Sequence, residues 1–296
     1  NVTINGRYVT AIGGSSGSTG GAGIGSGENA NYSGTVTING GVVYAEGGAD
    51  STSIGRGNRA IGTSDNGAFT TGTGGNAVIV APDGIGDPSG FADWDGIFIS
   101  YEGSNTSATV GEDGTVHLND TEANIQVWGE PVIDYPLVVE SGTELRVVQN
   151  DRNYAYATLE IGQDGKLTNN GTVTVDEGST LILLEGLDQT DGSGTLECTG
   201  TVKLPPEEKL IALSGAEDLT YNGTEQSPEV SVTLNLWGYS HTYGNPADYT
   251  VTYTDATNAG ETAKAVVTST GAGDLLAGSA SKTFVIQPCL LYTSDA

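Results

Sequence analysis

The stretch Val2-Thr-Ile-Asn-Gly6 returns residue for residue as Val36-Thr-Ile-Asn-Gly40, 34 positions later. Val9-Thr-Ala11 returns as Val43-Tyr-Ala45 at the same spacing. A fixed spacing of this length indicates a stack of structural units, because one short unit cannot bury its own apolar face and its neighbours must cover it. Each copy therefore predicts short strands that stack on those of the next copy.

Each copy also contains a glycine-rich corner with one isolated isoleucine. Gly23-Ile24-Gly25 is followed 30 positions later by Ser53-Ile54-Gly55, and the pattern appears again at Gly84-Ile85-Gly86. Glycine suits corners where φ is positive or where backbones approach closely. Over residues 1–92 these features predict glycine-rich repeats of a right-handed parallel β-helix, or β-solenoid, with Ile24, Val36 and Ile54 pointing inward.

Residues 93–204 lack the isoleucine corners but keep short strands behind glycine-led turns. Examples are Gly165-Lys-Leu-Thr168, Gly171-Thr-Val-Thr-Val175 and Gly178-Ser-Thr-Leu-Ile-Leu183. Inward Leu, Val and Ile alternate there with outward Thr, Asp and Glu, as in strands with one buried face. We predict that the β-solenoid rungs continue through these residues.

Longer strands follow a linker at Lys203-Leu-Pro-Pro-Glu-Glu-Lys209. The double proline and the charges mark the break. Apolar and polar residues alternate over 229–236, 249–253, 262–269 and 281–286, with Gly, Asn and Pro in the turns between these stretches. An all-β chain that ends in a small antiparallel sandwich over residues 205–288 is the resulting prediction.

The last eight residues, 289–296, share no pattern with the strands before them. They resemble the in-frame translation of a sequencing adapter, and we expect them to be an artefact tail that takes no part in the fold. Cys198 then stands as a lone cysteine, which predicts neither a disulfide framework nor a metal cluster. It is interpreted as a small buried hydrophobic residue.

Charge and composition exclude several classes of protein. The chain has 296 residues, with 37 Asp and Glu against 10 Lys and Arg, for a formal net charge of −27. Such an acidic chain is repelled by phosphate backbones and by anionic membranes. It has 46 glycines without Gly-X-Y periodicity, which excludes collagen. No apolar run of about 18 residues and no signal peptide are visible, and we expect a chain truncated at both ends.

The repeats resemble the glycine-rich β-solenoid regions of adhesin-like surface proteins from Gram-positive gut bacteria. This resemblance rests on the paired Val-Thr-Ile-Asn-Gly and Gly-Ile-Gly units and on the stretch Lys166–Val175. Residues 209–288 resemble a bacterial immunoglobulin-like (Ig-like) repeat domain, through Leu219–Gly223, Asp248–Tyr253 and Lys282–Phe284. That family places an aromatic residue in a late turn where this chain has Leu275-Leu276.

The resemblance implies an extracellular protein of the cell wall or cell surface, in which a stiff β-solenoid stalk is followed by an Ig-like spacer. Its role would be structural or adhesive. It implies host or microbial glycans or surface proteins as partners. Nucleic acid and membrane insertion are not expected, and neither is enzymatic activity, because His117 and His241 lie in different predicted domains and form no triad with a nucleophile.

An acidic group offers the best candidate for metal chemistry. Asp83, Asp87, Asp93 and Asp95 are spaced by turns, and carboxylates with backbone carbonyls are the ligands that Ca²⁺ prefers. The loop patterns of the EF-hand and of the calcium-binding nonapeptide repeats are both missing. A solvated turn is therefore the alternative, and we expect no cofactor unless this group holds Ca²⁺.

Aromatic residues supply a candidate glycan platform. Trp237, Tyr239 and Tyr243 lie at alternate positions of Trp237-Gly-Tyr-Ser-His-Thr-Tyr243 and share one face of an extended strand. A packed edge of the sandwich is the alternative interpretation. Trp94 and Trp128 are further candidates.

Three other functions remain open beside the stalk. A carbohydrate-binding module would use the aromatic platform. A remnant of a polysaccharide lyase or glycoside hydrolase would use paired carboxylates. Ice binding would rest on Thr35-Val-Thr37 and Thr172-Val-Thr174 alone.

Overall fold

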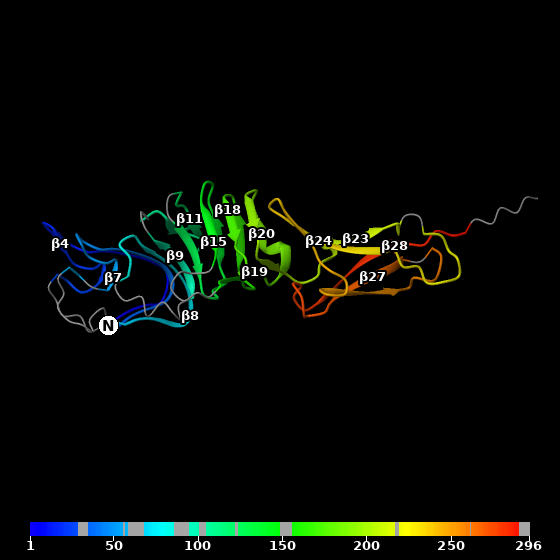
Figure 1. Cartoon of the computed structure of the whole chain (residues 1–296), viewed down its shortest axis with the longest axis horizontal. Coiled ribbons are helices and arrows are strands. Elements are labelled where there is room, and N and C mark those ends of the chain that lie inside the picture. The colour runs from blue at the N-terminus through cyan, green and yellow to red at the C-terminus, as the bar shows by residue number, and fades with distance from the viewer. Residues whose placement is uncertain are drawn as a thin grey trace, which may run out of the picture. The chain divides into compact units, whose positions relative to one another are not determined.

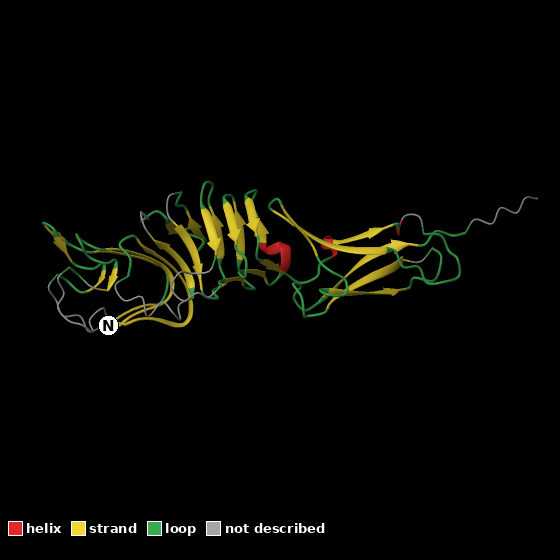
Figure 2. Ribbon diagram, in the orientation of Figure 1, coloured by secondary structure: helices red, strands yellow, loops and turns green. Residues whose placement is uncertain are grey.

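The protein is all-β, and the described part of the chain has short 3₁₀ turns at Gly186–Gln189 and Glu208–Leu210 (Figures 1 and 2). The computed structural model describes residues 1–28, 35–55, 57–58, 68–85, 95–100, 105–121, 124–148, 156–216, 219–260 and 262–289. The chain divides into two compact units. Residues 1–183 and 188–202 form the N-terminal unit, and residues 184–187 and 203–296 form the C-terminal unit.

The largest sheet of the N-terminal unit has nine strands and is almost entirely parallel. Its strands are β1 (Val2–Ile4), β6 (Thr35–Glu46), β8 (Ala68–Ala81), β9 (Gly96–Ser100), β12 (Asn124–Trp128), β15 (Glu144–Val147), β18 (Thr172–Val175) and β21 (Thr195–Cys198), with β2 (Tyr8–Ile12) also paired to β6. The predicted parallel sheets are therefore present.

Two further sheets complete most of this unit. The five-stranded one contains β10 (Ala108–Val110), β11 (Val116–Leu118), β14 (Pro136–Val139), β17 (Lys166–Asn169) and β20 (Thr190–Asp191). The four-stranded one contains β13 (Val132–Ile133), β16 (Thr158–Ile161), β19 (Thr180–Leu183) and β22 (Thr201–Lys203). Two short pairs are β3 (Ser15–Ser16) with β4 (Thr19–Gly20), and β5 (Ile24–Gly25) with β7 (Ile54–Gly55).

The register that the sequence repeats predict is confirmed. Val2 pairs with Val36, Val9 with Val43, and Ile24 with Ile54. Ile85 forms the next parallel bridge to Ile54, so the isoleucine corners stack as a column. Glycine is required in this column, because a Cβ on Gly25, whose φ is +146°, would lie 2.0 Å from the carbonyl oxygen of Gly55.

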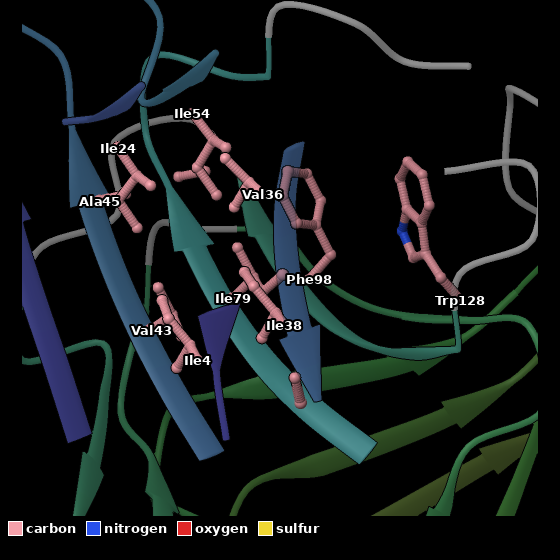
Figure 3. Close-up of a cluster of buried hydrophobic side chains, with 12 residues drawn as sticks. Ile4, Ile24, Val36, Ile38, Val43, Ala45, Ile54, Ile79, Phe98 and Trp128 are labelled. Atoms are coloured by element: carbon pink, nitrogen blue, oxygen red, sulfur yellow. The ribbon is translucent and has the colours of Figure 1, made fainter. Parts of the chain in front are cut away.

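The stacked repeats bury one apolar cluster, here called the N-terminal core (Figure 3). Ile24, Val36 and Ile54 all lie in it and are at most 6% exposed, as the inward orientation requires. Phe98 and Trp128 close the cluster with their rings 5.1 Å apart in an edge-to-face arrangement. Trp128 is only 5% exposed, so it is a core residue and offers no surface platform.

From β11 onward the chain visits the five-, nine- and four-stranded sheets in turn. From β14 to β21, each visit adds a strand parallel to the one from the previous round. Leu137 of β14 pairs with Val116 of β11 and with Leu167 of β17. Leu145 of β15 pairs with Ile125 of β12 on one side and with Val173 of β18 on the other. Similar apolar residues thus stack from one pass to the next.

Parallel β-solenoid rungs were predicted over residues 1–92 and 93–204, and the nine-stranded sheet departs from this at one pairing. β9 and β12 are antiparallel, with Ile99 opposite Ile125. β10 and β11 between them form an antiparallel hairpin in the next sheet, closed by a turn in which the Gly111 amide donates to the Thr115 carbonyl at 2.8 Å. This hairpin reverses the chain, so the strands before β9 and after β12 run in opposite directions.

The C-terminal unit consists of two three-stranded antiparallel sheets. One contains β23 (Ile211–Ser214), β24 (Glu229–Leu236) and β25 (Tyr239–Thr242), and the other contains β26 (Tyr249–Thr254), β27 (Thr262–Ser269) and β28 (Ser279–Val285). Their shared core includes Ala263, Ala265 and Phe284, with Val230 and Leu213 packed against it.

The late turn in which the sequence departs from Ig-like domains is packed by a leucine. Leu275 is 2% exposed and bridges to Leu204, and the Leu276 amide donates to the Leu204 carbonyl at 3.0 Å. Cys198 is half-buried and Cys289 is exposed. The rest of the expected artefact tail, residues 290–296, lies outside the described residues.

The isoleucine column gives a direct test of the register. Ile54→Ala should lower the free energy of unfolding by about 2–5 kcal/mol, since it opens a cavity in a packed core. Ile12→Ala is the matched control, because Ile12 is 64% exposed and its truncation should change stability by no more than about 0.5 kcal/mol. Denaturant unfolding of both variants measures the difference, and equal midpoints would show that the stacking register is wrong.

Candidate functional site

The predicted aromatic platform surrounds a tight hairpin turn in the C-terminal unit. Leu236 of β24 pairs with Tyr239 of β25, which leaves Trp237 and Gly238 as a two-residue loop. Both have positive φ, +47° and +82°, as a type I′ turn requires. A bulky residue rarely adopts positive φ, so the turn holds Trp237 at the tip of the hairpin at a cost in backbone strain.

The three predicted platform residues differ in exposure. Trp237 and Tyr239 are half-buried, whereas Tyr243 is only 2% exposed. Tyr243 therefore packs at the edge of the sheet and is not available to stack on a sugar. His241 takes its place in the exposed part of the row, with its ring stacked on Tyr239 at 6.3 Å and edge-to-face with Tyr243 at 4.8 Å.

Sequence reasoning did not assign His241 to the platform, although it lies between Tyr239 and Tyr243 at the same alternate spacing. The row lies on the face of the sheet that also carries Leu234 and Leu236, because these leucines are directly opposite His241 and Tyr239. The packed-edge alternative therefore applies to Tyr243, and the glycan platform stays a prediction for the rest of the row. Tyr243 belongs to the packed edge, and Trp237, Tyr239 and His241 remain partly open to solvent.

The loop after Tyr243 is fixed by one carboxylate. Asp248 accepts hydrogen bonds from the amide of Gly244 at 2.6 Å and from the amide of Asp274 at 2.9 Å. Thr270 donates its hydroxyl to the Ala247 carbonyl at 2.8 Å. A Cβ on Gly273 would lie 1.9 Å from the Asp248 carboxylate, so the two loops approach closely and hold the base of the aromatic hairpin.

Two members of the predicted calcium group serve as acceptors for backbone amides. Asp83 accepts from the amide of Gly47 at 2.8 Å, and Asp95 accepts from the amide of Glu130 at 2.8 Å. Each bond joins one pass of the chain to another. Asp87 and Asp93 lie outside the described residues. Within the described ranges, no three His, Cys, Asp or Glu side chains are grouped as a metal site would need.

A buried tyrosine adjoins Asp83. Tyr44 is 5% exposed and donates its hydroxyl to Glu46 at 2.6 Å. Burial, followed by this hydrogen bond and the charges of Glu46 and Asp83, raises the pKa of Tyr44 well above its usual range. The corner therefore keeps the phenol neutral, and it acts as a donor that holds one acidic side chain in place.

The two histidines have separate partners in separate units. His117 Nδ1 lies 2.7 Å from Glu140 Oε1 in the N-terminal unit, and His241 lies between two tyrosine rings in the C-terminal unit. Trp94 lies outside the described residues.

No protein-family model, curated protein or solved structure matches this chain. Among the described residues, no helix has the length and apolar character needed to cross a bilayer.

Proposed function

We propose that this chain is part of an extracellular cell-surface protein with a structural or adhesive role, in which the N-terminal unit is a β-solenoid stalk and the C-terminal unit is an Ig-like sandwich that serves as a spacer. The observation that carries the proposal is the in-register stacking of equivalent residues, Val2 on Val36 and Ile24 on Ile54 on Ile85. A stack of this kind grows by adding copies along one axis, which suits a stalk.

Backbone hydrogen bonds support the mechanical side of the proposal. Apart from the antiparallel pairs β9–β12 and β10–β11, parallel strands connect successive passes of the chain in the three large sheets. Polar ladders reinforce the corners, as where Asn169 donates to the Thr195 carbonyl and accepts from the Gly171 amide. Since each pass contacts mainly its neighbours, load along the stack is shared by many equivalent bonds.

The net charge of −27 supports a surface role of the same kind. Strong like charge keeps copies of a protein apart and soluble at high local density. In the later part of the nine-stranded sheet, the solvent-side row includes Arg146, half-exposed, and Glu197, exposed. Polar side chains in this row suit a sheet whose outer face is in contact with water.

Single-molecule pulling of the full chain tests the stalk. A stack with nearest-neighbour contacts should unfold in several steps, each releasing one pass of the chain. A pass of about 20–30 residues at about 3.5 Å per residue corresponds to roughly 70–105 Å of released length. The C-terminal unit should unfold in one longer event. Release of the whole N-terminal unit in a single event would contradict the stalk.

The surface location has its own test. Antibodies raised against this chain should label intact cells of the organism that produces it, and trypsin added to those cells should remove the label. Labelling that appears only after lysis would overturn the extracellular assignment.

A second candidate function, glycan binding, is favoured by the half-buried aromatic residues of the β24–β25 hairpin. A Trp at positive φ and the stacked Tyr239 and His241 rings offer flat apolar surface to a sugar. The lyase or hydrolase alternative has no comparable support, because Asp83 and Asp95 already hold backbone amides.

Trp237→Ala should weaken glycan binding about fivefold, as the loss of one platform contributing about 1 kcal/mol. Isothermal titration calorimetry with xylan, pectin, alginate and mucin glycans follows the binding, because its signal does not depend on the tryptophan that is replaced. Trp237→Phe serves as the control that keeps an aromatic ring. Equal affinity of the Trp237→Ala variant and the parent would show that glycans do not bind at this hairpin. New reducing ends in the same mixtures would show that the protein cleaves glycans and would overturn the non-enzymatic assignment.

A further inference from the structure

An open groove lies at one corner of the N-terminal unit. It has a volume of ≈ 370 Å³ and is lined by Tyr156, Asp176, Glu177 and Thr199. Three successive passes of the chain contribute to it. Tyr156 precedes β16, the two acidic residues lie between β18 and β19, and Thr199 lies between β21 and β22.

The tyrosine ring is presented to solvent on a backbone support. Tyr156 is 54% exposed, the most exposed tyrosine among the large hydrophobic residues at the described surface. Its ring lies against Gly178, where a Cβ would be 2.6 Å from Cδ1 and Cε1 of the ring. Glycine is needed there both for this contact and for a φ of +83°. The main chain at Gly178 therefore supports the ring from one side.

The floor of the groove is fixed by the backbone ladder. The amide of Asp176 donates to the Val147 carbonyl at 3.0 Å, and the amide of Thr199 donates to the Val175 carbonyl at 2.9 Å. The amide of Ser179 closes the turn onto the Asp176 carbonyl at 2.9 Å. These bonds fix the main-chain positions from which the two carboxylates and the hydroxyl project, which reduces the backbone entropy lost on binding.

The polar side chains of the groove accept hydrogen bonds more than they donate them. Glu177 and Thr199 are exposed, and Asp176 is half-exposed, with Oδ2 3.9 Å from Arg146 Nη2. Ionised carboxylates only accept, so they suit a ligand rich in hydroxyl or ammonium donors. They disfavour an anion, as does the net charge of −27. Two carboxylates and a hydroxyl fall short of the six to eight oxygens that Ca²⁺ takes.

We propose that the Tyr156 groove binds a pyranose sugar that has free hydroxyl or ammonium groups and no carboxylate. The apolar C–H face of the ring stacks on Tyr156, and the hydroxyl groups along its edge donate to Asp176 and Glu177. A flat ring beside carboxylate acceptors matches this ligand class in both its apolar face and its polar edge. The choice of a sugar as the ligand rests on the proposed function at the cell surface. The shape and the lining of the groove are independent of that proposal.

The test is saturation-transfer NMR on the full chain with methyl glucoside, glucosamine and glucuronate. Transfer to the first two and not to glucuronate is expected. Tyr156→Ala should weaken binding about five- to tenfold, whereas Tyr156→Phe should retain it. Tyr221→Ala is the matched control, because Tyr221 is another exposed tyrosine, at 41%, in the C-terminal unit.

Thermal melting of each variant establishes that it is folded, and Tyr156→Ala should melt with the parent because its side chain is mostly exposed. Equal binding by Tyr156→Ala and the parent, equal transfer to glucuronate, or no transfer to any of the sugars would overturn the proposal. Comparing the saturation transfer to methyl glucoside with that to glucosamine shows whether the groove prefers hydroxyl or ammonium donors. None of these results depends on the pulling or labelling experiments, so this site and the stalk can fail separately.

Discussion

The antiparallel pairing of β9 with β12 is the contact on which the arrangement of the N-terminal unit depends. Every other pairing recorded for the described part of its nine-stranded sheet is parallel. The reversal is made by a bent hairpin, in which β9 and β12 pair in one sheet and β10 and β11 pair in the next. Strands before it and after it share one continuous sheet while running in opposite directions.

A reversal of strand direction has a consequence for where the core lies. Crossovers between parallel strands are right-handed in about 98% of cases. When the strands turn round while the stack keeps advancing, right-handed crossovers must pass over the opposite face of the sheet. The rows of paired residues show this change. Ile79 and Phe98 lie in the N-terminal core, whereas their partners further along the row, Gln126, Arg146 and Glu197, are polar.

The neighbouring row stays apolar throughout, through Val80, Ile99, Ile125, Leu145 and Val173, each 0% exposed. It therefore becomes the inward face once the chain has reversed. The register of the early repeats was predictable because identical residues must stack on one another. The reversal was not, because alternation of apolar and polar residues is the same in either direction along a strand. Tyr156 and His241 were missed for a similar reason, since their exposure depends on which strands become their neighbours.

The acidic surplus is accommodated through backbone hydrogen bonds as well as ion pairs. With 37 acidic and 10 basic side chains, most carboxylates have no cation to pair with. Several accept backbone amides at corners instead, as Asp83 does from Gly47, Asp95 from Glu130 and Asp248 from Gly244. At Asp113 and Asp191 such bonds, from Thr115 and Gly192, are the main cause of a lowered pKa.

These bonds explain why the corners favour aspartate. Its short side chain reaches an amide one or two residues away, or on the adjacent pass, without the rotamer entropy that a longer side chain loses. Corners of a stacked chain leave amides that strands do not satisfy, and each needs an acceptor. Negative charge at the corners therefore completes the hydrogen bonding of the fold, and the same charge gives the surface its repulsion toward other acidic molecules. Stability and surface character thus depend on one set of side chains.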